Sequence, residues 1–258
     1  SAMFHHAIVR PPGANFADGL TTVALGAPDY PTALRQHEQY CRALEQCGLQ
    51  LIRLEADVRY PDSTFVEDTA ILVEGRALLT RPGAPSRAGE VDEMRAVLAG
   101  LVPALAAIVA PGTLDGGDIC EAGRHFFIGL SERTNEEGAR QLTALLAGWG
   151  CSAACVDIRG LPGILHLKSG LSCLAGERLV VIDALADHPA FAGYERVRVP
   201  PGEEYAANCV QVNDFVLLPH GFPGLAARLR ELGSAPLLLD MSEYRKMDGG
   251  LSCLSLRF

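Results

Sequence analysis

Hydrophobic residues are distributed along the chain in a unit that recurs five times. Each unit begins with apolar residues at helical spacing, which predict an amphipathic helix. Each predicted helix ends at a glycine, a residue that tolerates the left-handed conformation found after many helices. An apolar strand, a polar loop and two alternating runs around a tight turn follow. Thr134 and Glu137 have the spacing of a capping box. The predicted helices cover residues 31–47, 89–99, 134–149, a weaker segment ending near 193, and 223–232.

The strand that follows each predicted helix is expected at residues 49–54, 105–110, 153–158, 196–199 and 236–239. Continuous hairpins are predicted at residues 70–80, 119–129, 171–182 and 209–219. The fifth pair would form between residues 251–258 and 4–10, so that the two ends of the chain close a ring. A repeat of roughly 40 to 50 residues is typical of units that cannot bury their apolar faces alone. The pattern therefore predicts an α/β fold, a five-bladed αβ propeller.

We expect one domain over residues 3–258, because Ser1-Ala2 before Met3 has the form of a cloning remnant. In a closed ring the polar loops should converge on the axis. These loops cover residues 62–68, 113–118, 164–170, 203–208 and 244–253. A long insertion rich in Gly, Pro and Ala, residues 11–29, interrupts the first unit and is predicted to be a mobile lid.

Charge and cysteine content narrow the class of partner and the compartment. The net charge of −9 and the pI near 5.3 argue against a nucleic-acid or anionic-membrane surface and suit a cationic small molecule. No apolar run approaches the roughly 20 residues of a membrane helix, and the first residues do not read as a secretory signal. Eight cysteines without a C-x-x-C pair indicate reduced thiols in the cytoplasm.

The polar loops contain the parts of a nucleophilic site. Cys253, His166 and Asp115 supply a thiol, an imidazole and a carboxylate, which together can act as nucleophile, general acid/base and orienting group. Taken singly, each has a simpler interpretation, since a strand cysteine packs in many cores, a histidine among apolar residues is often buried, and Asp-Gly-Gly forms turns. A zinc site made of Cys, His and Asp is the alternative use of the same groups.

The excess of acidic residues is the more informative feature of these loops. Clustered carboxylates would raise the pKa of a catalytic thiol unless a cation lies among them, and the substrate is the candidate for that cation. Arg87 and Arg133 each lie between a hairpin and a helix, where they are either solvated or available to clamp a carboxylate. A cationic head and a carboxylate tail describe an amino acid such as arginine or a derivative of it.

Five segments resemble motifs of the dimethylarginine dimethylaminohydrolases, a family of the guanidine-modifying pentein superfamily. They are YPDSTFVED (60–68), LDGGDI (114–119), HLKSG (166–170), EEYAANC (203–209) and SEYRKMDGGLSC (242–253). The resemblance extends over essentially the whole chain and implies a five-bladed αβ propeller. It also implies hydrolysis of asymmetric dimethylarginine or monomethylarginine to citrulline and an alkylamine through a covalent thiouronium on cysteine, without a metal or an organic cofactor.

Roles follow from the resemblance position by position. Cys253 resembles the nucleophile, His166 the general acid/base, and Asp115 the carboxylate partner of that histidine. Met247 departs from the aliphatic residue often found at its position. The residues that resemble substrate ligands are Leu20, Asp62, Glu67, Asp68, Arg87, Arg133 and, through its backbone, Met247.

Two other functions stay open. An arginine deiminase would act on unmethylated arginine with the same chemistry, although the chain has no stretch long enough for the inserted helical domain that such enzymes usually carry. A non-catalytic pentein would be a binding module and would have no need of Cys253 and His166. The expected partner is a small-molecule substrate rather than nucleic acid or a membrane. A homodimer is one possible oligomeric state.

Overall fold

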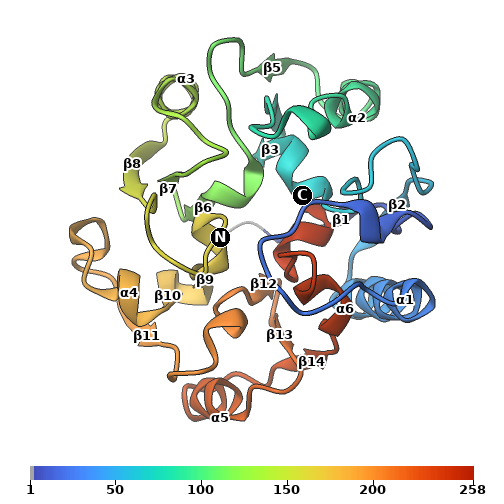
Figure 1. The fold of residues 1–258 in the computed structure, drawn as a ribbon. Helices are drawn as coiled ribbons and strands as arrows, with labels where there is room; N and C mark the ends of the chain where they lie inside the picture. The colour runs from blue at the N-terminus through green and yellow to red at the C-terminus, as the bar shows by residue number, and fades with distance from the viewer. Residues whose placement is uncertain (1–2) are drawn as a thin grey trace.

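The computed structural model describes residues 3–258 and shows five three-stranded sheets arranged around a central axis (Figure 1). Each sheet has an inner strand antiparallel to the middle strand, and the middle strand pairs in parallel with an outer strand. The strand orders are β3-β4-β5, β6-β7-β8, β9-β10-β11, β12-β13-β14 and β15-β1-β2. The predicted five-bladed αβ propeller is confirmed. The proposed cloning remnant, residues 1–2, lies outside the described residues.

All four continuous hairpins form where the alternating pattern predicted them. The strands that build the first four sheets are β3 (Ala70–Val73), β4 (Arg76–Leu79), β5 (Leu105–Ala107), β6 (Ile119–Ala122), β7 (His125–Leu130), β8 (Ser152–Asp157), β9 (Leu171–Leu174), β10 (Arg178–Val181), β11 (Arg196–Arg198), β12 (Val210–Val212), β13 (Phe215–Pro219) and β14 (Leu237–Leu239). The ring is closed by β1 (His6–Val9), β2 (Gln50–Arg53) and β15 (Leu256–Arg257).

The two ends of the chain share one sheet, as predicted. Strand β15 pairs antiparallel with β1, with Ala7 opposite Arg257 and Ile8 opposite Leu256. The carbonyl of Phe258 also accepts from the main-chain amides of His5 and His6 at 2.8 and 2.7 Å. In Figure 1 the blue N-terminal segment accordingly lies beside the red C-terminal segment. The last residues are thus held at the hub by a sheet that the first residues complete.

The longer helices lie around the outside of the ring (Figure 1). They are α1 (Tyr30–Gln46), α2 (Glu90–Ala99), α3 (Glu136–Gly148) and α5 (Pro223–Glu231), and two single turns are α4 (Asp183–Ala186) and α6 (Ser242–Arg245). The predicted helix ending near Gly193 is reduced to α4 and a 3-10 turn at Pro189–Phe191. Pro189 explains the break, because it disfavours helical conformation in the residue before it.

Two predictions about helix ends are wrong. The cap of α3 is Asn135, whose side chain accepts from the amide of Gly138 at 2.8 Å, because the hydroxyl of Thr134 instead donates to Asp118 at 2.6 Å. Gly100 has a φ of −80° and needs no glycine, whereas the glycines after the other predicted helices have φ of at least 78°.

The apolar core is shared between neighbouring units. One buried cluster combines Phe127 of β7 with Val180 of β10 and Val216 of β13, which belong to three different sheets. The repeats are therefore not independent folding units, as the repeat length predicted. Within residues 3–258 we find no helix with the length and apolar character that spanning a bilayer requires.

Candidate active site

Each polar loop ends in a short 3-10 turn directly before or close to the inner strand of its unit. The turns are Val66–Thr69, Gly116–Asp118, Leu167–Ser169, Glu204–Ala207 and Ser252–Leu254. The sequence pattern assigned Cys253 both to the end of the polar loop 244–253 and to the strand segment 251–258, but Cys253 lies inside the last of these turns, before β15 begins at Leu256. The turns bring side chains from separate units to the hub.

A cavity at the hub is lined by most of the predicted site residues. Its walls are Leu20, Asp62, Phe65, Asp68, Arg87, Arg133, Leu165, His166, Met247, Asp248, Gly249 and Cys253. The thiol and the imidazole therefore face one space. That space leaves about 20 Å³ to a water-sized sphere, which is little more than one water requires. An amino acid can enter only when part of the wall moves.

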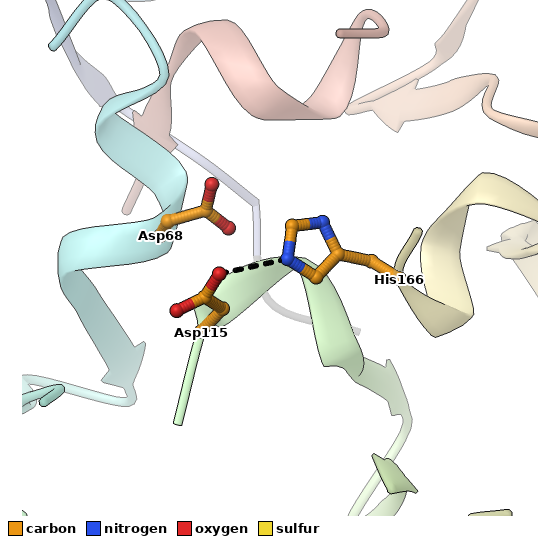
Figure 2. Close-up of side chains that lie close together, drawn as sticks. All are labelled: Asp68, Asp115 and His166. Atoms are coloured by element: carbon orange, nitrogen blue, oxygen red, sulfur yellow. Dashed lines mark hydrogen bonds and ion pairs between the residues drawn. The ribbon is translucent and has the colours of Figure 1, made fainter. Parts of the chain in front are cut away.

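Asp115 does not line the cavity but lies behind His166 and orients it. Its Oδ2 is 2.8 Å from Nε2 of the imidazole, and its Oδ1 accepts from the amide of Gly83 at 3.0 Å. The dashed line in Figure 2 marks the contact between Asp115 and His166. The close packing requires glycine at position 117, where an added Cβ would be 2.7 Å from Nδ1 of His166. Asp115 is fully buried, so its carboxylate is available to His166 rather than to solvent.

The surroundings of His166 favour its charged form. Burial lowers its pKa, but Asp68, Asp118 and Asp115 outweigh this and raise the pKa to about 9. Asp118 is not exposed and accepts from Ser131, Thr134 and the amide of Leu167. At neutral pH His166 is therefore an imidazolium, which can donate a proton to a leaving group.

The thiol of Cys253 is held in its neutral form. Burial and the nearby carboxylates of Glu67 and Asp68 raise its pKa to about 12, while the amide of Gly250 at 3.4 Å from Sγ and the ammonium of Lys168 lower it. A resting thiol at this position is a weak nucleophile, because the thiolate is the reactive form. A cation placed among the carboxylates would lower the pKa of the thiol.

The two predicted arginines have different surroundings. Arg87 is buried and donates to Asp68 at 2.7 Å and to both oxygens of Glu90 at 2.8 Å. Burial raises the pKa of Asp68, yet His166 and Arg87 lower it to about 2, so Asp68 is ionised. Among residues 3–258, the guanidinium of Arg133 has a single partner, Oδ2 of Asp115 at 3.4 Å, and its side chain is more exposed than that of Arg87. Arg133 is thus better placed than Arg87 to bind a second carboxylate.

Glu67 was expected among the substrate ligands, but it does not line the cavity. Its Oε1 accepts from Ser252, and its Oε2 accepts from Arg257 and pairs with Lys168, all at 2.9 Å. Neighbouring residues in a 3-10 turn point in different directions, so Asp68 faces the cavity while Glu67 turns to Ser252 and its other partners. Motif resemblance alone did not separate these two acids.

The predicted lid covers the cavity. The amide of Leu20 donates to both oxygens of Asp62 at 3.2 Å, and the amide of Thr22 donates to Asp248 at 2.6 Å. Leu20 is 41% exposed, which places it between the cavity and solvent. Phe16 anchors the segment, because it is buried against Phe65 and Tyr244. Motion of this lid stays a prediction.

Asp68, Asp115 and His166 are the only metal-ligand group within residues 3–258, with one donor atom of each within 4.8 Å of the others. Figure 2 shows these three side chains facing one another. Arg87 donates to Asp68 and Arg133 to Asp115, so guanidinium groups already supply positive charge to both acids. The thiol of Cys253 is not part of the group. The donor set thus differs from the zinc site considered from the sequence.

A closed ring of five αβ units with a thiol, an imidazole and acids at its hub defines a protein of the pentein class. The chain is 44% identical over 257 residues to the N(G),N(G)-dimethylarginine dimethylaminohydrolase of Pseudomonas aeruginosa, covering 99% of this chain and 100% of the relative. It is 34% identical over 253 residues to the protein of the same name from Streptomyces coelicolor, covering 97% and 96%. The chain belongs to the dimethylarginine dimethylaminohydrolase family.

Solved structures agree with this assignment. A cysteine-to-serine variant of the P. aeruginosa protein complexed with citrulline has a TM-score of 0.96 and 43% identity, with both chains fully covered. A histidine-to-glycine variant of a dimethylarginine dimethylaminohydrolase, as an adduct with S-methyl-L-thiocitrulline, has a TM-score of 0.95 and 44% identity over 99% of this chain and 100% of that one. The N-terminal domain of ArgZ, at 18% identity and a TM-score of 0.85, shares the fold. No family model matches the chain.

Proposed function

We propose that this chain hydrolyses methylated arginines, asymmetric dimethylarginine and monomethylarginine, to L-citrulline and dimethylamine or methylamine. The observation that carries the proposal is the meeting of Cys253 and His166 in one cavity with the ionised Asp68. Two solved relatives add support, because the cysteine replaced in one and the histidine replaced in the other are separated by the same number of residues as Cys253 and His166.

The substrate binds through its two charged ends. Asp68 pairs with the guanidinium, and Arg133 receives the α-carboxylate, with Arg87 holding Asp68 in place. Asp62, Leu20 and the backbone of Met247 hold the amino-acid end. The apolar side chains of Phe65 and Leu165 line the same cavity and suit N-methyl groups. These ligand assignments are based on the motifs that resemble those of the family and on the positions of the side chains around the cavity.

Chemistry starts when the bound guanidinium lowers the pKa of the Cys253 thiol, which releases its proton to water. The thiolate attacks the guanidinium carbon, and a tetrahedral adduct forms. The His166 imidazolium then protonates the alkylated nitrogen, the C–N bond breaks, and the amine leaves a thiouronium on sulfur. Neutral His166 next takes a proton from water as the oxygen bonds to carbon. Finally the C–S bond breaks, the hydroxyl proton of the adduct passes to water, and citrulline leaves. The sulfur then takes up a proton from water and returns to the resting thiol.

The test is a substrate panel applied to the wild type and to Cys253→Ser. Turnover of asymmetric dimethylarginine with release of dimethylamine is expected for the wild type and should vanish in the variant, which should keep the wild-type circular dichroism spectrum. Release of ammonia from unmethylated arginine as the faster reaction would identify a deiminase instead. A folded wild type that binds arginines without turnover would identify a binding module.

The second step is tested by His166→Gly, which removes the acid/base. Because the thiouronium needs a base on water to be hydrolysed, this variant should accumulate a covalent adduct with a substrate that carries a good leaving group. Mass spectrometry of the intact protein would detect the adduct. Its absence with every such substrate would contradict the two-step scheme.

Compartment and assembly are further parts of the proposal. Eight free cysteines suit the reducing cytoplasm, where such thiols persist. A homodimer remains a prediction that analytical ultracentrifugation would check. The reaction as written uses side chains of this chain alone and needs no metal or organic cofactor.

A further inference from the structure

The fourth polar loop, residues 203–208, has no part in the reaction proposed above. It nevertheless reaches the hub, because Asn208, which follows the 3-10 turn Glu204–Ala207, contacts Ser252 beside the nucleophile. Asn208 is buried, with 5% of its surface exposed, and each polar atom of its side chain has a partner. A buried amide with all its partners within the protein is held in one orientation.

Asn208 forms a closed pair of hydrogen bonds with the residue before the nucleophile. The amide of Ser252 donates to Oδ1 of Asn208 at 3.0 Å, and Nδ2 of Asn208 donates to the hydroxyl of Ser252 at 2.8 Å. The hydroxyl then donates to Glu67 at 2.9 Å. The approach is close enough to require Gly250, where an added Cβ would be 2.5 Å from Oδ1 of Asn208. The turn that carries Cys253 is thus fixed through its neighbour.

The same side chain also holds the loop of the general acid/base. Nδ2 of Asn208 donates a second hydrogen bond, to the carbonyl of Lys168 at 2.9 Å. Lys168 lies in the 3-10 turn that His166 caps. Ser252 offers an N–H and Lys168 offers a carbonyl, so the site needs an acceptor and a donor from one side chain. An amide provides both, together with a second N–H for the hydroxyl of Ser252. A carboxylate has no donor, and a hydroxyl has only one donor hydrogen.

We propose that Asn208 is a positioning residue that sets the distance between the Cys253 thiol and the His166 imidazole. The inference rests on the proposed function, because it assigns those two groups to bond formation and proton transfer. Asn208 does not line the cavity, so its effect on the reaction passes through Ser252 and Lys168. Attack by a thiolate needs the reacting atoms near contact distance, and an error of about 1 Å costs on the order of 100-fold in rate.

The experiment compares Asn208→Ala with Asn213→Ala. Asn213 is a matched control, since its side chain also makes three hydrogen bonds between separate segments, to the main chain of Phe4 and of Cys47, but it lies in a hairpin turn away from the cavity. Its φ of 53° makes alanine unfavourable there, so the control loses stability as well. We expect kcat of Asn208→Ala to fall by about 100-fold while KM stays within about threefold. Asn213→Ala should lose stability and keep the wild-type kcat.

Asn208→Asp provides a second variant in case Asn208→Ala does not fold. It keeps the shape and the acceptor for Ser252, loses both donors, and adds a negative charge near the thiol. Its kcat should fall, and its activity should need a higher pH, because the added charge raises the pKa of Cys253. Wild-type kcat in either folded variant would overturn the positioning role. Cys253→Ser is assayed in parallel, since activity in that variant would refute the proposed function itself, whatever Asn208 does.

Discussion

Replacing Asp115 by asparagine should lower the pKa of His166 by a measurable amount. The lost interaction is a hydrogen bond of 2.8 Å between a carboxylate and an imidazolium. Hydrogen bonds to charged groups contribute about 1.5–3 kcal/mol, and 1.36 kcal/mol corresponds to one pKa unit. The pKa of His166 should therefore fall from about 9 to roughly 7 to 8. The amide of Gly83 would hold the new carbonyl oxygen, so the new NH₂ would face Nε2 and oppose its protonation.

The assay is an NMR titration of the histidine ring protons, with His166 assigned by its disappearance in His166→Gly. The high-pH limb of kcat should move down with the same pKa, because only imidazolium can protonate the leaving amine. Asp62→Asn is the control, since Asp62 lines the same cavity but contacts the lid amide of Leu20 rather than His166. A His166 pKa within half a unit of the wild type in Asp115→Asn would refute the assigned role of Asp115.

Three further predictions concern the lid and pH. Phe16→Ala should cost about 3–5 kcal/mol of unfolding free energy in urea titrations, because Phe16 is buried; an unchanged midpoint would contradict the anchor. Asp248→Gly, in which glycine suits the φ of 58° at this position, removes the hydrogen bond that holds Thr22 of the lid. This variant should raise KM about tenfold and speed proteolysis within residues 11–29. A wild-type KM would show that the hydrogen bond between Thr22 and Asp248 is not needed for substrate binding. Since the folded pKa of His166 lies above 6.5, its stabilisation of about 3 kcal/mol is complete below pH 6.5 and lost as pH rises through 9. Denaturant midpoints should fall over that range, and less so in Asp115→Asn.

Periodicity predicted the ring because each hairpin and outer strand carries its own apolar pattern. The closure by β1 and β15 followed from the same pattern, although β15 has only two residues. The 3-10 turns of the polar loops were missed, since a turn of three or four residues contains no hydrophobic period. The single turn α6 was missed for the same reason.

The polar-loop pattern predicted that Cys253, His166 and Asp115 lie together near the hub, but it did not predict the contacts that support them. Thr134 was assigned to a helix cap, but a buried carboxylate, Asp118, competes for its hydroxyl. Asn208 lies in one of the predicted polar loops, but the sequence assigned it no role. A short polar residue in a loop gives the same pattern whether it faces solvent or connects two segments. Only coordinates distinguish Glu67 from Asp68, since their difference is the direction of a side chain.

The charges at the hub make nucleophile activation depend on the substrate. The carboxylate of Asp68 raises the pKa of both His166 and Cys253, so the same group that keeps the acid charged keeps the thiol protonated. A thiolate is also the form of cysteine that oxidants attack. The protonated thiol of Cys253 is therefore less readily oxidised in the resting enzyme. A guanidinium next to Asp68 offsets the negative charge and lowers the thiol pKa. A neutral ligand such as citrulline leaves that charge in place, so selectivity for a cation arises in bond formation as well as in binding.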